Sequence, residues 1–127
     1  FPVTSRAAPK VETILAAKKL FNEIEYPIIM HCKSGADRAG LMSALYLILH
    51  ENMPVDEAKK QLSFKYLHIK HAKTGILDAF FDNYLKENKN NTFLEWVKND
   101  YDPEKLKQSF KVKKLSEILS TYILRRE

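Results

Sequence analysis

This chain of 127 residues has little cysteine and glycine, and it has no long hydrophobic run. Its one cysteine, Cys32, excludes a disulfide within the chain and fits the reducing conditions of the cytoplasm. No stretch of about twenty apolar residues occurs, which excludes a membrane-spanning helix in this part of the protein. Three glycines and 45% hydrophobic residues are not the composition of a disordered segment. We expect one folded, cytoplasmic domain. Because the first residue is Phe1 rather than Met, an upstream signal or membrane anchor stays open.

The charge of the chain favours an anionic partner. Lysine and arginine outnumber aspartate and glutamate by 21 to 16, which gives a net charge of +5, and the isoelectric point is near 9.2. This balance suits an anionic substrate or surface, and it is equally typical of an ordinary lysine-rich protein. Aromatic residues are not interleaved with a basic stripe, so nucleic-acid binding is not favoured.

Most of the chain has the pattern of amphipathic or buried helices. Apolar residues recur every three or four positions, and the segment over 39–50 is apolar nearly all round, which is typical of a central helix. Thr92 and Glu95 have the spacing of a capping box, and Asp102-Pro103 is typical of a helix start. The predicted helices cover residues 10–25, 39–50, 54–62, 74–87, 93–97 and 103–122. Only the apolar run 28–31 and the short β-prone segment 1–4 are predicted as strands.

The most informative segment joins the predicted strand 28–31 to the helix that follows it. It reads His31-Cys32-Lys33-Ser34-Gly35-Ala36-Asp37-Arg38. Backbone N–H groups at the start of a helix bind anions, and the same positive end favours the thiolate form of a cysteine. The Arg38 guanidinium offers a planar fork for two phosphate oxygens. Gly35 permits a positive φ or a close approach of the backbone to a ligand. The segment therefore predicts a site that binds and attacks a phosphate group.

This segment resembles the signature of cysteine-dependent phosphatases, in which His-Cys is followed by five residues and Arg. The chain is most similar to the bacterial dual-specificity type within the protein tyrosine and dual-specificity phosphatase superfamily. The resemblance implies an α/β fold with a parallel sheet of four or five strands flanked by helices. Since only two strands are predicted, we expect the others to lie upstream of Phe1. We expect one phosphatase domain over 1–127, with a core over 1–87, the phosphate-binding loop at 31–38 and C-terminal helices over 88–127.

The resemblance also implies roles for the residues of the loop. Cys32 would attack phosphorus, and Arg38 would bind two phosphate oxygens and stabilise the transition state. His31 would order the loop, or it would be a core histidine without effect on Cys32. No metal and no cofactor are expected, because Arg38 and the backbone amides carry the charge. The phosphate-binding residues would be Lys33, Ser34, Gly35, Ala36, Asp37 and Arg38.

The general acid is less evident than the nucleophile. The family usually supplies an Asp from an upstream loop, and the loop over 4–9 contains no acidic residue. Asp37 is the one acid of the motif, and its place resembles that of a proposed proton donor in myotubularin-type lipid phosphatases and some bacterial phosphatases that accept phosphoinositides. Alternatively, Asp37 is an acid favoured by the helix dipole. Ala39 stands where the family usually has Ser or Thr, which predicts slower hydrolysis of the cysteinyl-phosphate.

Two further segments carry weaker signals. Residues 65–73 are rich in positive and titratable side chains, and they form either one wall of the pocket or a solvated helix end. His68 and His71 have helical spacing for a metal, but no third ligand is evident. Arg6 would contact the substrate phosphate or Asp37, or it would lie exposed on its loop.

The predicted function is hydrolysis of phosphomonoesters through a cysteinyl-phosphate, as in a protein tyrosine or dual-specificity phosphatase. Two alternatives stay open: a phosphoinositide or inositol phosphate phosphatase, and a non-catalytic pseudophosphatase that binds phosphate. The expected partners are a phosphorylated protein or a phosphoinositide, with phosphate or vanadate as small ligands. Contact with a membrane stays open, and no nucleic-acid partner is expected.

Overall fold

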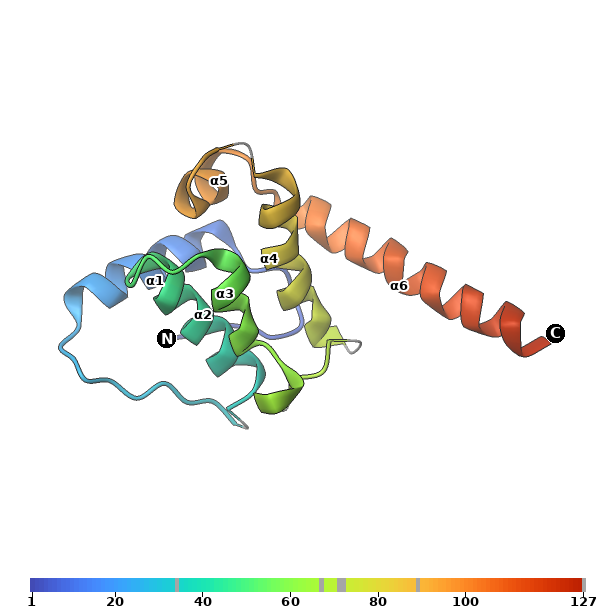
Figure 1. Cartoon of the computed structure of the whole chain (residues 1–127), viewed down its shortest axis with the longest axis horizontal. Coiled ribbons are helices and arrows are strands. Elements are labelled where there is room, and N and C mark those ends of the chain that lie inside the picture. Colours follow the sequence, from blue (N-terminus) through green and yellow to red (C-terminus); the bar gives the residue numbers. More distant parts are fainter. Residues whose placement is uncertain (34, 67, 71–72, 89, 127) are drawn as a thin grey trace.

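The computed structural model describes residues 1–33, 35–66, 68–70, 73–88 and 90–126. These residues form α-helices joined by loops and by short 3₁₀ helices (Figure 1). Most predicted helices are confirmed within a few residues at each end. The elements in chain order are α1 (Val11–Glu23), α2 (Asp37–Leu49), α3 (Val55–Ala58), η1 (Lys59–Gln61), η2 (Phe64–Tyr66), η3 (Lys73–Gly75), α4 (Ile76–Glu87), α5 (Phe93–Asn99) and α6 (Pro103–Arg126).

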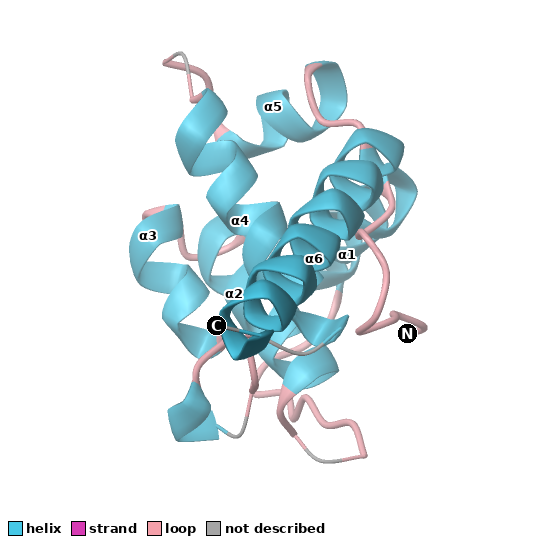
Figure 2. Ribbon diagram, turned by 90° about the vertical axis from the view of Figure 1, so that its right-hand side faces the viewer, coloured by secondary structure: helices cyan, strands magenta, loops and turns pink. Residues whose placement is uncertain are grey.

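The predicted α/β fold with a phosphatase-type parallel sheet is wrong. Figure 2 shows helices and loops only, and none of the described residues forms a strand. Residues 28–31, predicted as a buried strand, belong instead to the loop between α1 and α2, and Ile29 is 90% exposed. A strand is stable only when neighbouring strands pair with its backbone N–H and C=O groups. The described chain offers no such neighbour, so the apolar run stays a loop.

Helix α2 lies at the centre of the helical body, as its all-round apolar pattern predicts. It contacts α1, α3 and η1, and Leu41, Ala44 and Leu45 are at most 1% exposed. Gly40 permits a close approach, because a Cβ atom there would lie 3.2 Å from the Gln61 carbonyl oxygen. The packing of α2 on both sides fixes the orientation of its first turn, where the segment 31–38 ends.

A second part of the core is aromatic and joins α4 to α5. Thr92 caps α5, since its Oγ1 accepts a hydrogen bond of 3.2 Å from the Glu95 N–H, as predicted. Trp96 Nε1 donates to Glu87 Oε2 over 3.3 Å. The rings pack in edge-on and tilted contacts typical of aromatic clusters. The members are Phe80, Phe81, Tyr84, Phe93, Trp96 and Tyr101.

Helix α6 begins against this core and then leaves it. Asp102 caps its start by accepting hydrogen bonds from the N–H groups of Glu104 and Lys105, which confirms the predicted helix start. Leu106 is buried and Phe110 half-buried, and α6 contacts α4. Beyond that contact the helix projects from the body (Figure 1), and its apolar residues are exposed. None of the described helices is both long enough and apolar enough to cross a membrane.

Candidate active site

The motif segment lies at the end of a long loop that leads into α2. Tyr26 fixes the first part of this loop: its hydroxyl donates a hydrogen bond of 2.6 Å to the Phe21 carbonyl oxygen, and its ring stacks on His50. Gly35, near the other end, has a φ of +73°, in the left-handed region that glycine adopts without strain. The loop therefore turns at Gly35, and α2 begins two residues later.

The start of α2 leaves backbone donors available for an anion. Ala36 precedes the helix, and it has no side-chain group that could cap it. The first intrahelical bond runs from the Gly40 N–H to the Ala36 carbonyl oxygen over 3.0 Å. The N–H groups of the residues between them have no acceptor within the helix. The sequence predicts a phosphate cradle from the N–H groups of residues 33–38, and two of these, those of Asp37 and Arg38, belong to the start of α2.

Cys32, Lys33 and Arg38 line one cavity of about 850 Å³ between this loop, the N-terminal segment and helices α1 and α2. Lys33 and Arg38 are exposed and Cys32 is half-buried. The described residues around them supply no carboxylate: apart from His31, the rest of the lining is apolar. Those apolar residues are Phe1, Pro2, Val3, Leu20, Phe21, Ile24, Ile28, Ile29, Met30, Ala39 and Met42. A thiol, three basic side chains and an apolar wall together favour an anion that carries an apolar group.

Asp37, the predicted proton donor, is not among the residues that line the cavity. Its Oδ1 lies 2.7 Å from Nδ1 of His68, whose Nε2 lies 2.5 Å from Oδ2 of Asp78 in α4. The side chain of His68 is 1% exposed, and those of Asp37 and Asp78 are 28% and 14% exposed. The three side chains form a hydrogen-bonded chain, with the buried His68 ring between two partly exposed carboxylates, that joins the start of α2 to α4.

The two carboxylates determine the charge of His68. Burial by itself lowers the pKa of the imidazole, but the hydrogen bonds that the ring donates to Asp78 and Asp37, together with their negative charges, outweigh it and raise the pKa above the usual 6.5. A neutral imidazole has one N–H, whereas the imidazolium has two. Only the charged form donates to both carboxylates, so the geometry and the direction of the pKa shift agree.

The hydrogen-bonded link from Asp37 through His68 to Asp78 could not be predicted from the sequence. His68 was predicted as part of a pocket wall, of a solvated helix end or of a metal pair, and it is instead a buried partner of Asp37 and Asp78. Asp37 and Asp78 lie 31 and 10 residues from His68, so no helical spacing links the three.

The remaining predicted residues are placed as follows. His31 lines the cavity and is exposed, so it is not a core histidine. Arg6 is exposed and is not a lining residue. Ser34 and His71 lie outside the described residues. Within the described part of the chain no group of three or more His, Cys, Asp or Glu side chains is arranged to hold a metal ion.

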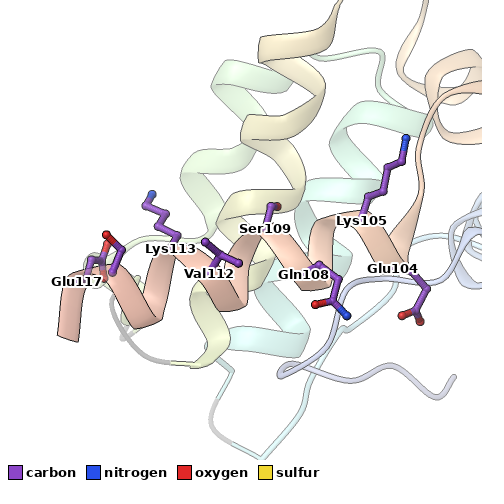
Figure 3. A pocket seen from close by; sticks show the side chains of 8 residues that line it. Glu104, Lys105, Gln108, Ser109, Val112, Lys113 and Glu117 are labelled. Carbon is purple, nitrogen blue, oxygen red and sulfur yellow. The ribbon is translucent and has the colours of Figure 1, made fainter. Parts of the chain in front are cut away.

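A second concavity, of about 830 Å³, runs along α6 (Figure 3). All its lining residues, from Glu104 to Glu117, belong to that one helix. It is an open groove without a facing wall, and it contains no residue of the motif. The cavity at Cys32 is therefore the stronger candidate.

We compared the chain with family models, with curated proteins and with solved structures, and none of them matches it. The assignment of a function consequently depends on the residues and on their geometry.

Proposed function

We propose that the chain is a cysteine-dependent phosphomonoester hydrolase whose preferred substrates are aryl phosphates, with phosphotyrosine as the biological form. The observation that carries the proposal is the shared cavity of Cys32, Lys33 and Arg38. Among the residues that the structure describes, the rest of its lining is apolar apart from His31 and includes no carboxylate. The left-handed Gly35 and the uncapped first turn of α2 support it, because they add backbone donors beside these side chains.

The reaction has two steps. In the first, the Cys32 thiolate attacks phosphorus, an S–P bond forms, and the P–O bond to the alcohol breaks with its electron pair leaving on oxygen. Arg38 and the α2 amides bind the other phosphate oxygens as their charge changes. In the second, water attacks phosphorus, the S–P bond breaks, and inorganic phosphate leaves while the thiolate is restored. The proton lost by this water balances the proton that the leaving oxygen takes up.

The preference for aryl phosphates follows from the same lining. A phenolate leaves without full protonation, whereas a serine or threonine alkoxide needs a proton donor. The lining supplies no carboxylic acid, and its apolar residues suit an aromatic ring. A phosphoinositide has an alcohol leaving group and a polar ring, so this cavity favours it less.

The test is phosphate release from p-nitrophenyl phosphate, compared between the wild-type chain and Cys32→Ser, with a chelator present and no metal added. We expect activity that survives the chelator and is lost in the variant. The matched control is Ser43→Ala, a half-buried position in α2 away from the loop, which should keep the activity.

Three results would contradict the proposal in whole or in part. Equal activity in wild type and Cys32→Ser would exclude the thiol as nucleophile. Tight binding of vanadate without turnover or a burst of p-nitrophenol would instead indicate a phosphate-binding protein. Faster hydrolysis of phosphoinositides than of phosphotyrosine peptides would keep the thiol chemistry and overturn the aryl preference.

A further inference from the structure

His68 is buried, does not line the cavity and takes no part in the proposed reaction. We propose that His68 is a positioning residue: its ring joins Asp37, the first residue of α2, to Asp78 in α4, and so holds the turn that presents Arg38 to the cavity. This inference rests on the proposed function of that cavity, because positioning has a consequence only if Arg38 binds the substrate.

The first step of the argument is the geometry of the ring. Both ring nitrogens of His68 are within hydrogen-bond distance of a carboxylate oxygen, at 2.7 Å for Asp37 and 2.5 Å for Asp78. Hydrogen bonds between charged partners are stronger than neutral ones, and burial of the ring protects them from water. The ring therefore fixes the distance between the start of α2 and α4.

The second step is the rigidity of the support behind the ring. The backbone N–H of His68 donates to the Ser63 carbonyl oxygen over 3.0 Å. At Gly75 a Cβ atom would lie 1.9 Å from the Lys70 carbonyl oxygen, so the segment after His68 packs directly on the turn that precedes α4. The histidine is thus held by its own backbone as well as by the two acids.

The third step is the position of Asp37. It is the residue immediately before Arg38, and the two share the first turn of α2. A carboxylate in the first turn is stabilised by the helix dipole, and its hydrogen bond to His68 fixes the rotation of that turn. Arg38 points from the same turn toward the cavity that it lines. Loss of the His68 bond would free the turn and lower the affinity for phosphate.

If His68 positions the α2 start through its charge, the properties of that turn should change with pH, whereas an ordinary packing role would give no such pH dependence. The charged groups that act on His68 come from two elements, Asp37 in α2 and Asp78 in α4. When the ring becomes neutral it can donate to one acid only, so the link between the two elements is lost. The orientation of the α2 start should therefore follow the titration of the ring.

The experiment compares wild type, His68→Gln and the control Glu57→Gln. The control removes only an exposed ion pair with Lys60, so it should bind vanadate as wild type does. Vanadate is the probe, and its dissociation constant is measured from pH 6 to 9. The ratio between variant and wild type cancels the ionisation of vanadate itself. For His68→Gln we expect a dissociation constant roughly ten times that of wild type at low pH, which is the effect of one lost charge-assisted hydrogen bond. This ratio should fall toward 1 at higher pH, where the wild-type ring is neutral. A ratio near 1 at every pH, or a raised ratio that does not change with pH, would overturn the proposal.

A second measurement separates this inference from the proposed function. The imidazole resonances and the backbone amide resonances of Gly35 to Arg38 are titrated by NMR without any ligand. We expect the amides to shift with the His68 titration in wild type and to lose that shift in His68→Gln, where no titratable ring remains between Asp37 and Asp78. If the amide shifts follow the His68 titration but the protein neither binds vanadate nor hydrolyses aryl phosphates, only the proposed phosphatase function is refuted. If the amide shifts do not follow the titration, the positioning role of His68 is refuted, whatever the activity.

Discussion

The hydroxyl of Tyr101 donates a hydrogen bond of 2.6 Å to the carbonyl oxygen of Pro9, 92 residues earlier in the chain. Both residues are buried. The bond joins the segment before α1 to the turn between α5 and α6, and so links the aromatic core to the N-terminal segment that borders the cavity. Burial, with a further contribution from Asp102, raises the pKa of Tyr101 well above its usual range, so the hydroxyl stays a donor throughout the physiological pH range.

We expect Tyr101→Phe to destabilise the fold by about 1–3 kcal/mol, because it leaves the buried Pro9 carbonyl without its donor. For a domain of this size such a loss lowers Tm by several degrees, about 3–4 °C for each kcal/mol. Urea unfolding followed by Trp96 fluorescence measures it. Tyr66→Phe is the matched control, since Tyr66 is 43% exposed. An equal stability of both variants and wild type would show that the Tyr101 hydroxyl contributes nothing.

The stability of the fold should fall as pH rises above the usual His68 range. The folded-state pKa of His68 is raised above the unfolded value of 6.5, so its contribution is fully present below pH 6.5 and is lost as pH rises through the folded-state pKa. Unfolding free energies measured from pH 6 to 9 should decline in wild type and much less in His68→Gln. A decline in His68→Gln as steep as in wild type would assign the pH dependence to other groups.

Helices could be predicted from this sequence because their signals are local. The apolar residues of α2 recur around the whole helix, and Thr92 and Asp102 cap the helices that follow them. The structure of residues 28–31 could not be predicted from a local signal. A run such as Ile28-Ile29-Met30 is compatible with a strand or with an apolar loop, and the outcome depends on whether a partner strand is available.

The candidate site was predictable in part for the same reason. The order of Cys32, Gly35 and Arg38 is a local pattern, and the structure brings Cys32 and Arg38 to one cavity. The link from Asp37 to His68 and Asp78 is a tertiary contact between α2, α4 and the loop that carries His68. No period or spacing in the sequence encodes such a contact, so only the folded chain could reveal it.

Gly35 should tolerate asparagine better than valine. Its φ of +73° costs an ordinary residue about 1–2 kcal/mol, and asparagine adopts this region more readily than a β-branched residue. No described heavy atom lies within 4 Å of a Cβ atom there, so the effect comes from the backbone and not from a clash. We expect weaker vanadate binding in Gly35→Val than in Gly35→Asn. Equal affinities would show that the loop does not need this conformation to bind the anion.

Asp37→Asn separates two roles of Asp37. If Asp37 supports the α2 start through His68, the variant should lower kcat/KM for p-nitrophenyl phosphate and for an alkyl phosphate by similar factors. If Asp37 is the proton donor of the resemblance, the alkyl phosphate should lose far more, because its leaving group needs the proton. The hydrogen bond to His68 and the absence of Asp37 from the cavity lining favour the first result. A selective loss with the alkyl substrate would restore the proton-donor role.

Ala39→Ser should accelerate the second step of the proposed reaction. Ala39 lines the cavity, is 9% exposed and follows Arg38 in the first turn of α2, so a hydroxyl there would belong to the same lining as the Cys32 thiol. Hydrogen bonding to the departing thiolate stabilises the charge that develops on sulfur. In wild type we expect a burst of p-nitrophenol, equal to the enzyme concentration, before slow steady turnover. In Ala39→Ser the steady rate should rise and the burst should shrink. A faster burst with an unchanged steady rate would mean that the hydroxyl acts on the attack of Cys32 rather than on hydrolysis of the intermediate.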